Sequence, residues 1–169
     1  MIDRRVLLAG TGILAALAAL RVWLGGGGEV EAAGQSGRFE IEKSDDEWRQ
    51  LLSKAQYEVL RRHRTEPPGS SPLNDEHRKG TFVCAGCELP VYSSDAKYDS
   101  GTGWPSFHTP LPNAIGTAPD RSLFMLRTEV HCRRCGGHLG HVFEDGPPPT
   151  GLRYCMNGLA LKFVPDAPA

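Results

Sequence analysis

Two pairs of cysteines constrain the fold of this chain more than any other feature of its sequence. The pairs are Cys84-Ala85-Gly86-Cys87 and Cys132-Arg133-Arg134-Cys135. A two-residue spacing lets both thiolates of a pair face one metal ion from a tight turn, and four thiolates make a closed structural zinc site. The pairs are separated by residues 88–131, so the metal would join distant strands rather than fold one small finger. We therefore predict one structural Zn²⁺ per chain, bound by Cys84, Cys87, Cys132 and Cys135.

The N-terminal segment has the pattern of a targeting signal rather than of folded structure. Arg4 and Arg5 precede a largely apolar run over residues 6–20, which is the arrangement of a twin-arginine (Tat) export signal. An uncleaved membrane anchor is the alternative, since the run is barely long enough to span a bilayer. We expect export to the periplasm or cell envelope. The predicted organisation is a signal or anchor with its linker at 1–37, one folded domain at 38–164 and a tail at 165–169.

Two other interpretations of the cysteine pairs remain open at this point. In an oxidising compartment each pair could close a short disulfide. Each could also be a thioredoxin-like redox pair, although neither follows a strand and opens a helix, as that site requires. The Tat route carries proteins that are already folded, so zinc could be loaded where thiols are reduced. The export and zinc interpretations are therefore compatible.

The fifth cysteine, Cys155, has no partner once the two pairs are assigned to a metal. An unpaired cysteine in an exported protein is either buried and inert or a reactive thiol. Its neighbours favour the reactive thiol, because Arg153 could lower the thiol pKa and Asn157 could donate to a developing oxyanion. Cys155 is therefore the candidate nucleophile.

Composition and turn residues favour a mainly β fold. The chain has 20 glycines and 13 prolines, which suits short strands joined by many turns. Ser44 and Glu47 have the spacing of a helix capping box, so two short helices or one bent helix should follow and end before Pro67. Strand-like runs are expected at 81–83, 89–92, 123–130, 142–143 and 159–164.

The charge balance argues against one large class of partner. Lys plus Arg number 19 and Asp plus Glu number 20, so no net field would attract nucleic acid or an anionic membrane surface. We expect no nucleic-acid partner, and contact with a membrane only through an uncleaved N-terminal segment. A monomer is expected.

Three motifs occur in order along the domain. They are Gly103-Trp104-Pro105-Ser106-Phe107, then Gly137-His138-Leu139-Gly140-His141-Val142-Phe143-Glu144-Asp145-Gly146, then Arg153-Tyr154-Cys155-Met156-Asn157. Together with both cysteine pairs, they resemble the methionine-R-sulfoxide reductases (MsrB family) over about residues 44–164. The resemblance implies a β-tent-like MsrB catalytic domain of two antiparallel sheets, with short N-terminal helices and a four-cysteine zinc site. It also implies reduction of the R epimer of methionine sulfoxide to methionine.

The resemblance assigns a chemical role to several residues of these motifs. The Cys155 thiolate would attack the sulfoxide sulfur and become a sulfenic acid as methionine leaves. His138 and His141, with help from Asn157, would protonate the departing oxygen. Without the resemblance, a metal site or satisfied core histidines would be the better interpretation of the two histidines.

Other positions would shape the pocket or support the catalytic groups. Trp104 would form a wall against the methyl group of the sulfoxide, while Phe107 and His108 would shape the entrance. Asp145 would orient a histidine, and Arg153 would support the thiolate. Three further histidines have no motif around them and are expected to be structural or exposed, namely His63, His77 and His131.

One position departs from the family pattern. Many relatives have a cysteine inside the glycine pair before Trp-Pro, where it resolves the sulfenic acid as a disulfide, whereas this chain has Thr102. With the paired cysteines assigned to zinc, no internal resolving cysteine remains. We therefore predict a one-cysteine enzyme recycled by an external thiol, such as a thioredoxin-like reductant. Its substrates would be oxidised proteins that carry methionine-R-sulfoxide, or the free amino acid.

Two other functions stay open on the sequence alone. A different oxidoreductase or a hydrolase could use Cys155 with His141, as Cys-His proteases do. A non-enzymatic zinc-ribbon interaction module would use the cysteines for stability, and the histidines and Trp104 as a recognition surface. Turnover of one epimer of methionine sulfoxide, and its loss on Cys155→Ser substitution, would separate the reductase from both alternatives.

Overall fold

The computed structural model describes residues 39–122 and 125–167 of the chain. The predicted export signal at 1–37 therefore lies outside the described residues. Within the two described ranges, no helix has both the length and the apolar character needed to cross a membrane.

Two short helices open the described part of the chain, as the capping-box pattern predicts. Helix α1 (Asp45–Leu51) begins at Ser44, whose side chain accepts from the Glu47 backbone while the Glu47 side chain reaches back. Helix α2 (Lys54–Arg62) begins at Ser53 with a second capping box. This second cap explains why the segment forms two helices rather than one bent helix.

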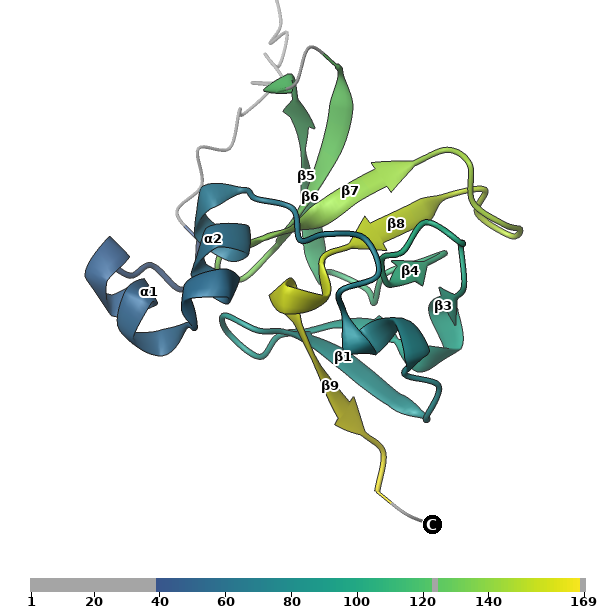
Figure 1. Cartoon of the computed structure of the whole chain (residues 1–169), viewed down its shortest axis with the longest axis horizontal. Coiled ribbons are helices and arrows are strands. Elements are labelled where there is room, and N and C mark those ends of the chain that lie inside the picture. The colour runs from purple at the N-terminus through teal and green to yellow at the C-terminus, as the bar shows by residue number, and fades with distance from the viewer. Residues whose placement is uncertain (1–38, 123–124, 168–169) are drawn as a thin grey trace, which may run out of the picture. The chain divides into compact units, whose positions relative to one another are not determined.

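The remaining elements form two antiparallel sheets, which confirms the predicted fold class (Figure 1). The three-stranded sheet has the order β2-β1-β9, and the six-stranded sheet has the order β3-β4-β8-β7-β6-β5. The first contains β1 (Gly80–Cys84), β2 (Pro90–Ser93) and β9 (Leu161–Pro165). The second contains β3 (Lys97–Tyr98), β4 (Ser106–Phe107), β5 (Ile115–Asp120), β6 (Arg127–Cys132), β7 (His138–Phe143) and β8 (Arg153–Met156). Short 3-10 helices include η1 (Pro72–Asp75), η2 (Ser94–Ala96) and η4 (Gly158–Ala160).

Sequence patterns located the three-stranded sheet better than the six-stranded one. The strand expected at 123–130 is β6, which begins later, at Arg127, and ends at Cys132. The strand expected at 142–143 is β7, which begins earlier, at His138. Strand β5 was not expected because Gly116 and Pro119 are typical of turns. It lies at the edge of its sheet, where proline is tolerated. Strand β9 continues to Pro165, one residue into the predicted tail.

A single cluster of buried side chains draws on both sheets and both helices. Phe82 of β1, Tyr92 of β2 and Phe107 of β4 are completely buried, and the rings of Tyr92 and Phe107 stack with their centroids 4.3 Å apart. Trp48 of α1 and Leu60 of α2 join the same cluster. Each fully buried aromatic side chain contributes roughly 1.5–3 kcal/mol to stability. This core packs against one face of the six-stranded sheet and supports it from that side.

A β-bulge in β7 changes the direction in which its histidines point. The register between β6 and β7 shifts between Val130 and His131, which leaves one extra residue on β7 between His138 and Gly140. In a regular strand, His138 and His141 would face opposite sides of the sheet. The extra residue reverses the alternation, so both histidines lie on one face with ring centroids 5.3 Å apart.

The close approach of β8 to β7 makes Gly140 a sensitive position. A Cβ atom there would lie 2.1 Å from the backbone oxygen of Cys155 and 2.9 Å from the Cα of Met156. We predict that Gly140→Ala lowers the free energy of unfolding by about 1–3 kcal/mol, because the backbone of β8 must move. Urea denaturation measures this change. Gly86→Ala is the control, because a Cβ atom at Gly86 would lie 3.6 Å from the nearest atom, an ordinary contact distance. Equal stability of the two variants would contradict the prediction.

Candidate functional site

Four cysteine sulfurs converge at the ends of β1 and β6 and in the turns that follow these strands. The Sγ atoms of Cys84 and Cys135 are 3.8 Å apart, and those of Cys87 and Cys132 are 3.5 Å apart. A disulfide requires about 2.0 Å between sulfurs. All five cysteines are free, so the disulfide interpretation does not hold. Tetrahedral ligands at a Zn–S distance of about 2.3 Å would lie about 3.8 Å apart, so the cluster has the spacing of a four-thiolate metal site.

The position of this cluster suits a structural role. Cys84 ends a strand of the three-stranded sheet, whereas Cys132 ends a strand of the six-stranded sheet. A metal bound by both would join the two sheets. Because all four ligand positions are filled by sulfur, no open position would remain for catalysis.

A second group of functional side chains lies on one face of the six-stranded sheet. The register of β7 and β8 pairs His141 with Cys155, so the two side chains are cross-strand neighbours with Cβ atoms about 4.5–5.5 Å apart. The next strands pair Glu129 with His141, and Asp120 with Arg127. Residues directly opposite each other share a face, as do residues two apart on one strand, so these groups all lie on the same face of the sheet as the thiol.

A pocket opens over Cys155 and His141. Its lining also includes Thr65, Trp104, Arg127, Gly140, Phe143 and Asn157. Four of the predicted site residues therefore meet here: Cys155, His141, Trp104 and Asn157. His138 is buried and does not line the pocket. The pocket combines an aromatic wall, a thiol and an imidazole.

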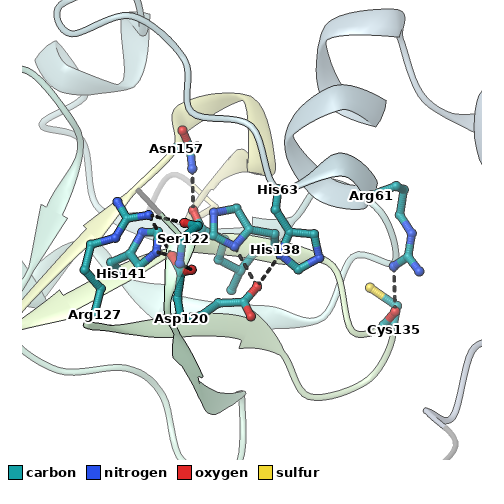
Figure 2. A network of polar contacts seen from close by, with 11 residues as sticks. Arg61, His63, Asp120, Ser122, Arg127, Cys135, His138, His141 and Asn157 are labelled. Atoms are coloured by element: carbon teal, nitrogen blue, oxygen red, sulfur yellow. Dashed lines mark hydrogen bonds and ion pairs between the residues drawn. The ribbon is translucent and has the colours of Figure 1, made fainter. Parts of the chain in front are cut away.

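Each of the two motif histidines is held by a carboxylate that the sequence analysis did not single out. His141 Nε2 lies 2.7 Å from Asp120 Oδ2, and His138 Nδ1 lies 2.7 Å from Glu129 Oε1 (Figure 2). A carboxylate only accepts, so the ring nitrogen that faces it carries the hydrogen and the other nitrogen is left as an acceptor. The carboxylates therefore set the tautomer of both rings.

Hydrogen bonds keep both carboxylates charged. The backbone N–H and the side chain of Ser122, followed by His141, hold the pKa of Asp120 well below its usual range. Burial acts to raise the pKa of Glu129, but hydrogen bonds from His138 and His63 outweigh it and the pKa lies well below its usual range. Both groups are anions at neutral pH, as orienting carboxylates must be.

Asp145 does not orient a histidine, and this prediction was wrong. Its two carboxylate oxygens accept from Arg153 Nε and Nη2, each at 2.8 Å. Asp145 follows the end of β7, where β8 returns with Arg153 opposite Phe143. Asp145 therefore pairs with Arg153, and the bidentate pair fixes the guanidinium instead of a histidine.

The Cys155 thiol is half-buried between Thr102 and Arg153. Its Sγ lies 3.9 Å from Thr102 Oγ1. Burial raises the pKa of the Cys155 thiol, and the Thr102 hydroxyl and the Arg153 guanidinium offset only part of that rise. The thiol therefore predominates at neutral pH, so a reaction that uses the thiolate would need a base. Burial lowers the pKa of His141, so a neutral imidazole lies opposite the thiol.

Phe107 and His108 do not shape the entrance of the pocket. Ser106 pairs with Cys155 and shares its face, so the next residue, Phe107, points to the opposite face and is fully buried in the core. His108 follows β4, and its carbonyl accepts from the Thr150 hydroxyl. Strand alternation, which the sequence analysis did not resolve, explains the correction for Phe107. His108 lies beyond the end of β4 and does not line the pocket.

One buried residue positions two walls of the pocket. The backbone carbonyl of Glu66 accepts from Trp104 Nε1 at 3.0 Å, and its backbone N–H donates to Asn157 Oδ1 at 3.0 Å. The Glu66 carboxylate accepts from two backbone N–H groups in η4. Asn157 Nδ2 also donates to Leu139, so its amide is tied to the backbone at both ends. Nothing in the sequence distinguished Glu66, because its partners lie far along the chain.

His63 also contacts the site, although it was expected to be structural or exposed. Its Nδ1 lies 3.0 Å from Glu129 Oε1, and its ring is 5.1 Å from the ring of His138 between centroids. The hydrogen bond to Glu129 raises the pKa of His63. Figure 2 shows His63 and His138 side by side, with His63 coming from the end of α2.

The fold and the site together define a class of protein. The arrangement is that of a thiol-dependent enzyme, with a half-buried cysteine beside a carboxylate-oriented histidine and a separate four-cysteine cluster that could hold a metal ion. A family model described as the SelR domain matches residues 52–165. The chain belongs to this family.

Several curated relatives are named peptide methionine sulfoxide reductase MsrB. The protein from Agrobacterium fabrum is 50% identical over 126 residues, which cover 74% of this chain and 93% of the relative. That from Bradyrhizobium diazoefficiens is 55% identical over 124 residues, covering 73% and 89%. That from Methanosarcina barkeri is 51% identical over 124 residues, covering 73% and 87%.

The pairing of Asp120 with His141 predicts a titration shift. The hydrogen bond and the charge of Asp120 both raise the pKa of His141, against the larger lowering by burial. We predict that Asp120→Asn lowers the pKa of His141 further, because burial is then less opposed. An NMR titration of the imidazole measures this shift. The control Asp46→Asn, at an exposed position on α1, should leave the pKa of His141 unchanged. An unaltered His141 pKa in Asp120→Asn would contradict the pairing of Asp120 with His141.

Proposed function

We propose that this chain reduces the R epimer of methionine sulfoxide to methionine, with Cys155 as the nucleophile. The observation that carries this proposal is the cross-strand pair of His141 and Cys155 beneath Trp104, in a member of the SelR family. The relatives named as methionine sulfoxide reductases support it. A zinc-ribbon interaction module would not require a thiol opposite an oriented imidazole.

The proton transfers follow from the tautomer of His141. Its Nε2 donates to Asp120, so Nδ1 is the acceptor that takes the proton of the Cys155 thiol. The thiolate attacks the sulfoxide sulfur, and the proton on His141 passes to the sulfoxide oxygen. The oxygen is transferred to Cys155 as a sulfenic acid while the thioether of methionine leaves. We assign these transfers to His141 rather than His138, which does not line the pocket.

Two pocket residues orient the substrate in this proposal. The Trp104 ring, held by its bond to Glu66, gives an apolar wall for the methyl group on the sulfoxide sulfur. With the methyl group against this wall and the oxygen toward His141, only one epimer presents its sulfur to Cys155. Asn157 holds the backbone next to the nucleophile rather than donating from a free amide.

The sulfenic acid must be reduced by a thiol from outside the chain. Four of the five cysteines lie in the metal cluster, and Thr102 contacts Cys155 where a resolving cysteine would stand. A first external thiol forms a mixed disulfide with Cys155 and releases water, and a second thiol releases Cys155. A thioredoxin-like protein is a suitable reductant of this kind.

We further propose Zn²⁺ as the metal of the four-cysteine cluster, with the chain exported by the Tat route as a monomer. Four thiolates at the observed spacing suit Zn²⁺, which has no redox chemistry that would compete with Cys155. The twin arginines Arg4 and Arg5 before an apolar run support export. Oxidised proteins of the periplasm or cell envelope would then be the substrates. N-terminal sequencing of the mature protein distinguishes cleavage from anchoring.

The activity has a direct test with the two separated epimers of a methionine sulfoxide peptide. With dithiothreitol as reductant, the R epimer should be converted to methionine and the S epimer should not. Cys155→Ser should lower turnover by about a hundredfold or more without loss of folding. Conversion of the S epimer, or undiminished turnover by Cys155→Ser, would refute the proposal.

Removal of the metal has a separate expected outcome. Cys87→Ser should release the bound zinc and lower the free energy of unfolding by roughly 3 kcal/mol or more, because a metal bound only by the folded state stabilises it. Metal analysis and thermal unfolding measure the two effects. Cys155→Ser should keep one zinc per chain. Full zinc content in Cys87→Ser would exclude Cys87 as a ligand.

A further inference from the structure

Three ligand-type side chains form a group that the proposed chemistry does not use: His63, Glu129 and His138. The Nδ1 atoms of His63 and His138 approach the same oxygen, Glu129 Oε1, at 3.0 and 2.7 Å (Figure 2). One ligand atom from each residue lies within 4.8 Å of the other two. None of these residues belongs to the four-cysteine cluster.

We propose that His63, Glu129 and His138 form a second metal site, which takes one divalent transition-metal ion such as Zn²⁺. Two imidazoles and one carboxylate are a ligand set that Zn²⁺ accepts, with the fourth position left to water. On binding, the hydrogen of each ring would move from Nδ1, which would bind the metal, to Nε2. The site goes beyond the reductase activity and does not rest on it. Its occupancy would tie the end of α2 to β6 and β7.

The distances require only a small expansion of this group. Ligand atoms at about 2.0–2.1 Å from a tetrahedral metal lie about 3.3 Å apart. The present separations from Glu129 Oε1 are 3.0 Å for His63 and 2.7 Å for His138, so these two distances would lengthen by a few tenths of an ångström. The ligand atoms of the two histidines lie within 4.8 Å of each other, and movement of His63 would set this third distance. His138 is fixed in the sheet. His63, whose side chain is 59% exposed, supplies both the movement and the route for the ion.

The backbone at His63 gives a second reason to look for a ligand there. His63 caps α2 in the left-handed region, with φ 55 and ψ 32. This conformation costs a residue with a Cβ atom about 1 kcal/mol or more, and glycine or asparagine is the usual choice. A histidine at this position bears that strain while its imidazole faces Glu129. Strained residues of this kind are found at functional sites.

The charges around the group favour a cation. Glu129 is an anion with only 13% of its side chain exposed. Burial lowers the pKa of His131, so this neighbouring histidine of β6 adds no positive charge at neutral pH. The positive charge of Arg61 acts against a charge on His63, and the Arg61 guanidinium donates to the Cys135 carbonyl at 3.0 Å.

The test is a Zn²⁺ titration of the full chain with its cysteine cluster already loaded. Isothermal titration calorimetry and metal analysis should find one further Zn²⁺ per chain. His63→Asn should weaken this second binding at least tenfold, since asparagine suits the left-handed backbone but lacks the imidazole. His77→Asn, at an exposed histidine, and Cys155→Ser should leave it unchanged.

Three results would overturn the second site. The first is a total of one Zn²⁺ per chain. The second is equal weakening by His63→Asn and His77→Asn, which would indicate binding by surface histidines in general. The third is loss of the second ion in Cys155→Ser, which would place it on the catalytic thiol. Binding is measured without turnover, so failure of the reductase proposal would not affect this outcome.

Discussion

The pairing of β7 with β8 is the constraint on which the rest of the site depends. It places His141 opposite Cys155, and it can do so only because Gly140 leaves room for the β8 backbone. The bulge in β7 then turns His138 to the same face. Two histidines three residues apart in the sequence thus lie on one side of a sheet, although regular alternation would separate them.

Burial and the charge of Arg153 shift the pKa of the Cys155 thiol in opposite directions, and burial has the larger effect. Arg153 favours the thiolate but is itself neutralised by Asp145 in a bidentate pair, so the pKa of Cys155 remains raised. In the proposed reaction the site therefore depends on a base, and Asp120 would prepare His141 for that role by fixing its tautomer. A metal in the four-cysteine cluster would support this arrangement from a distance by joining the ends of β1 and β6.

Local patterns in the sequence predicted the features that are local in the fold. The capping box at Ser44, the two cysteine pairs and the fold class were readable because each depends on neighbouring residues or on composition. The partners of the histidines were not, because Asp120 and Glu129 reach them only through strand register. Phe107 and Asp145 were misassigned for the same reason, since a motif does not state which face each residue takes. The cysteine count and the neighbouring residues had already made Cys155 the candidate nucleophile, and the family resemblance added its reaction but not the carboxylates that hold the histidines.

The central claim is that Cys155 is the sole redox thiol of the chain. Its most direct test is mass spectrometry of the protein after reaction with methionine-R-sulfoxide in the absence of any reductant. The account predicts one methionine formed per chain and one added oxygen, located on Cys155 as a sulfenic acid, with the four cluster cysteines unmodified. An intramolecular disulfide that includes Cys155, or methionine formation with Cys155 unmodified, would contradict it.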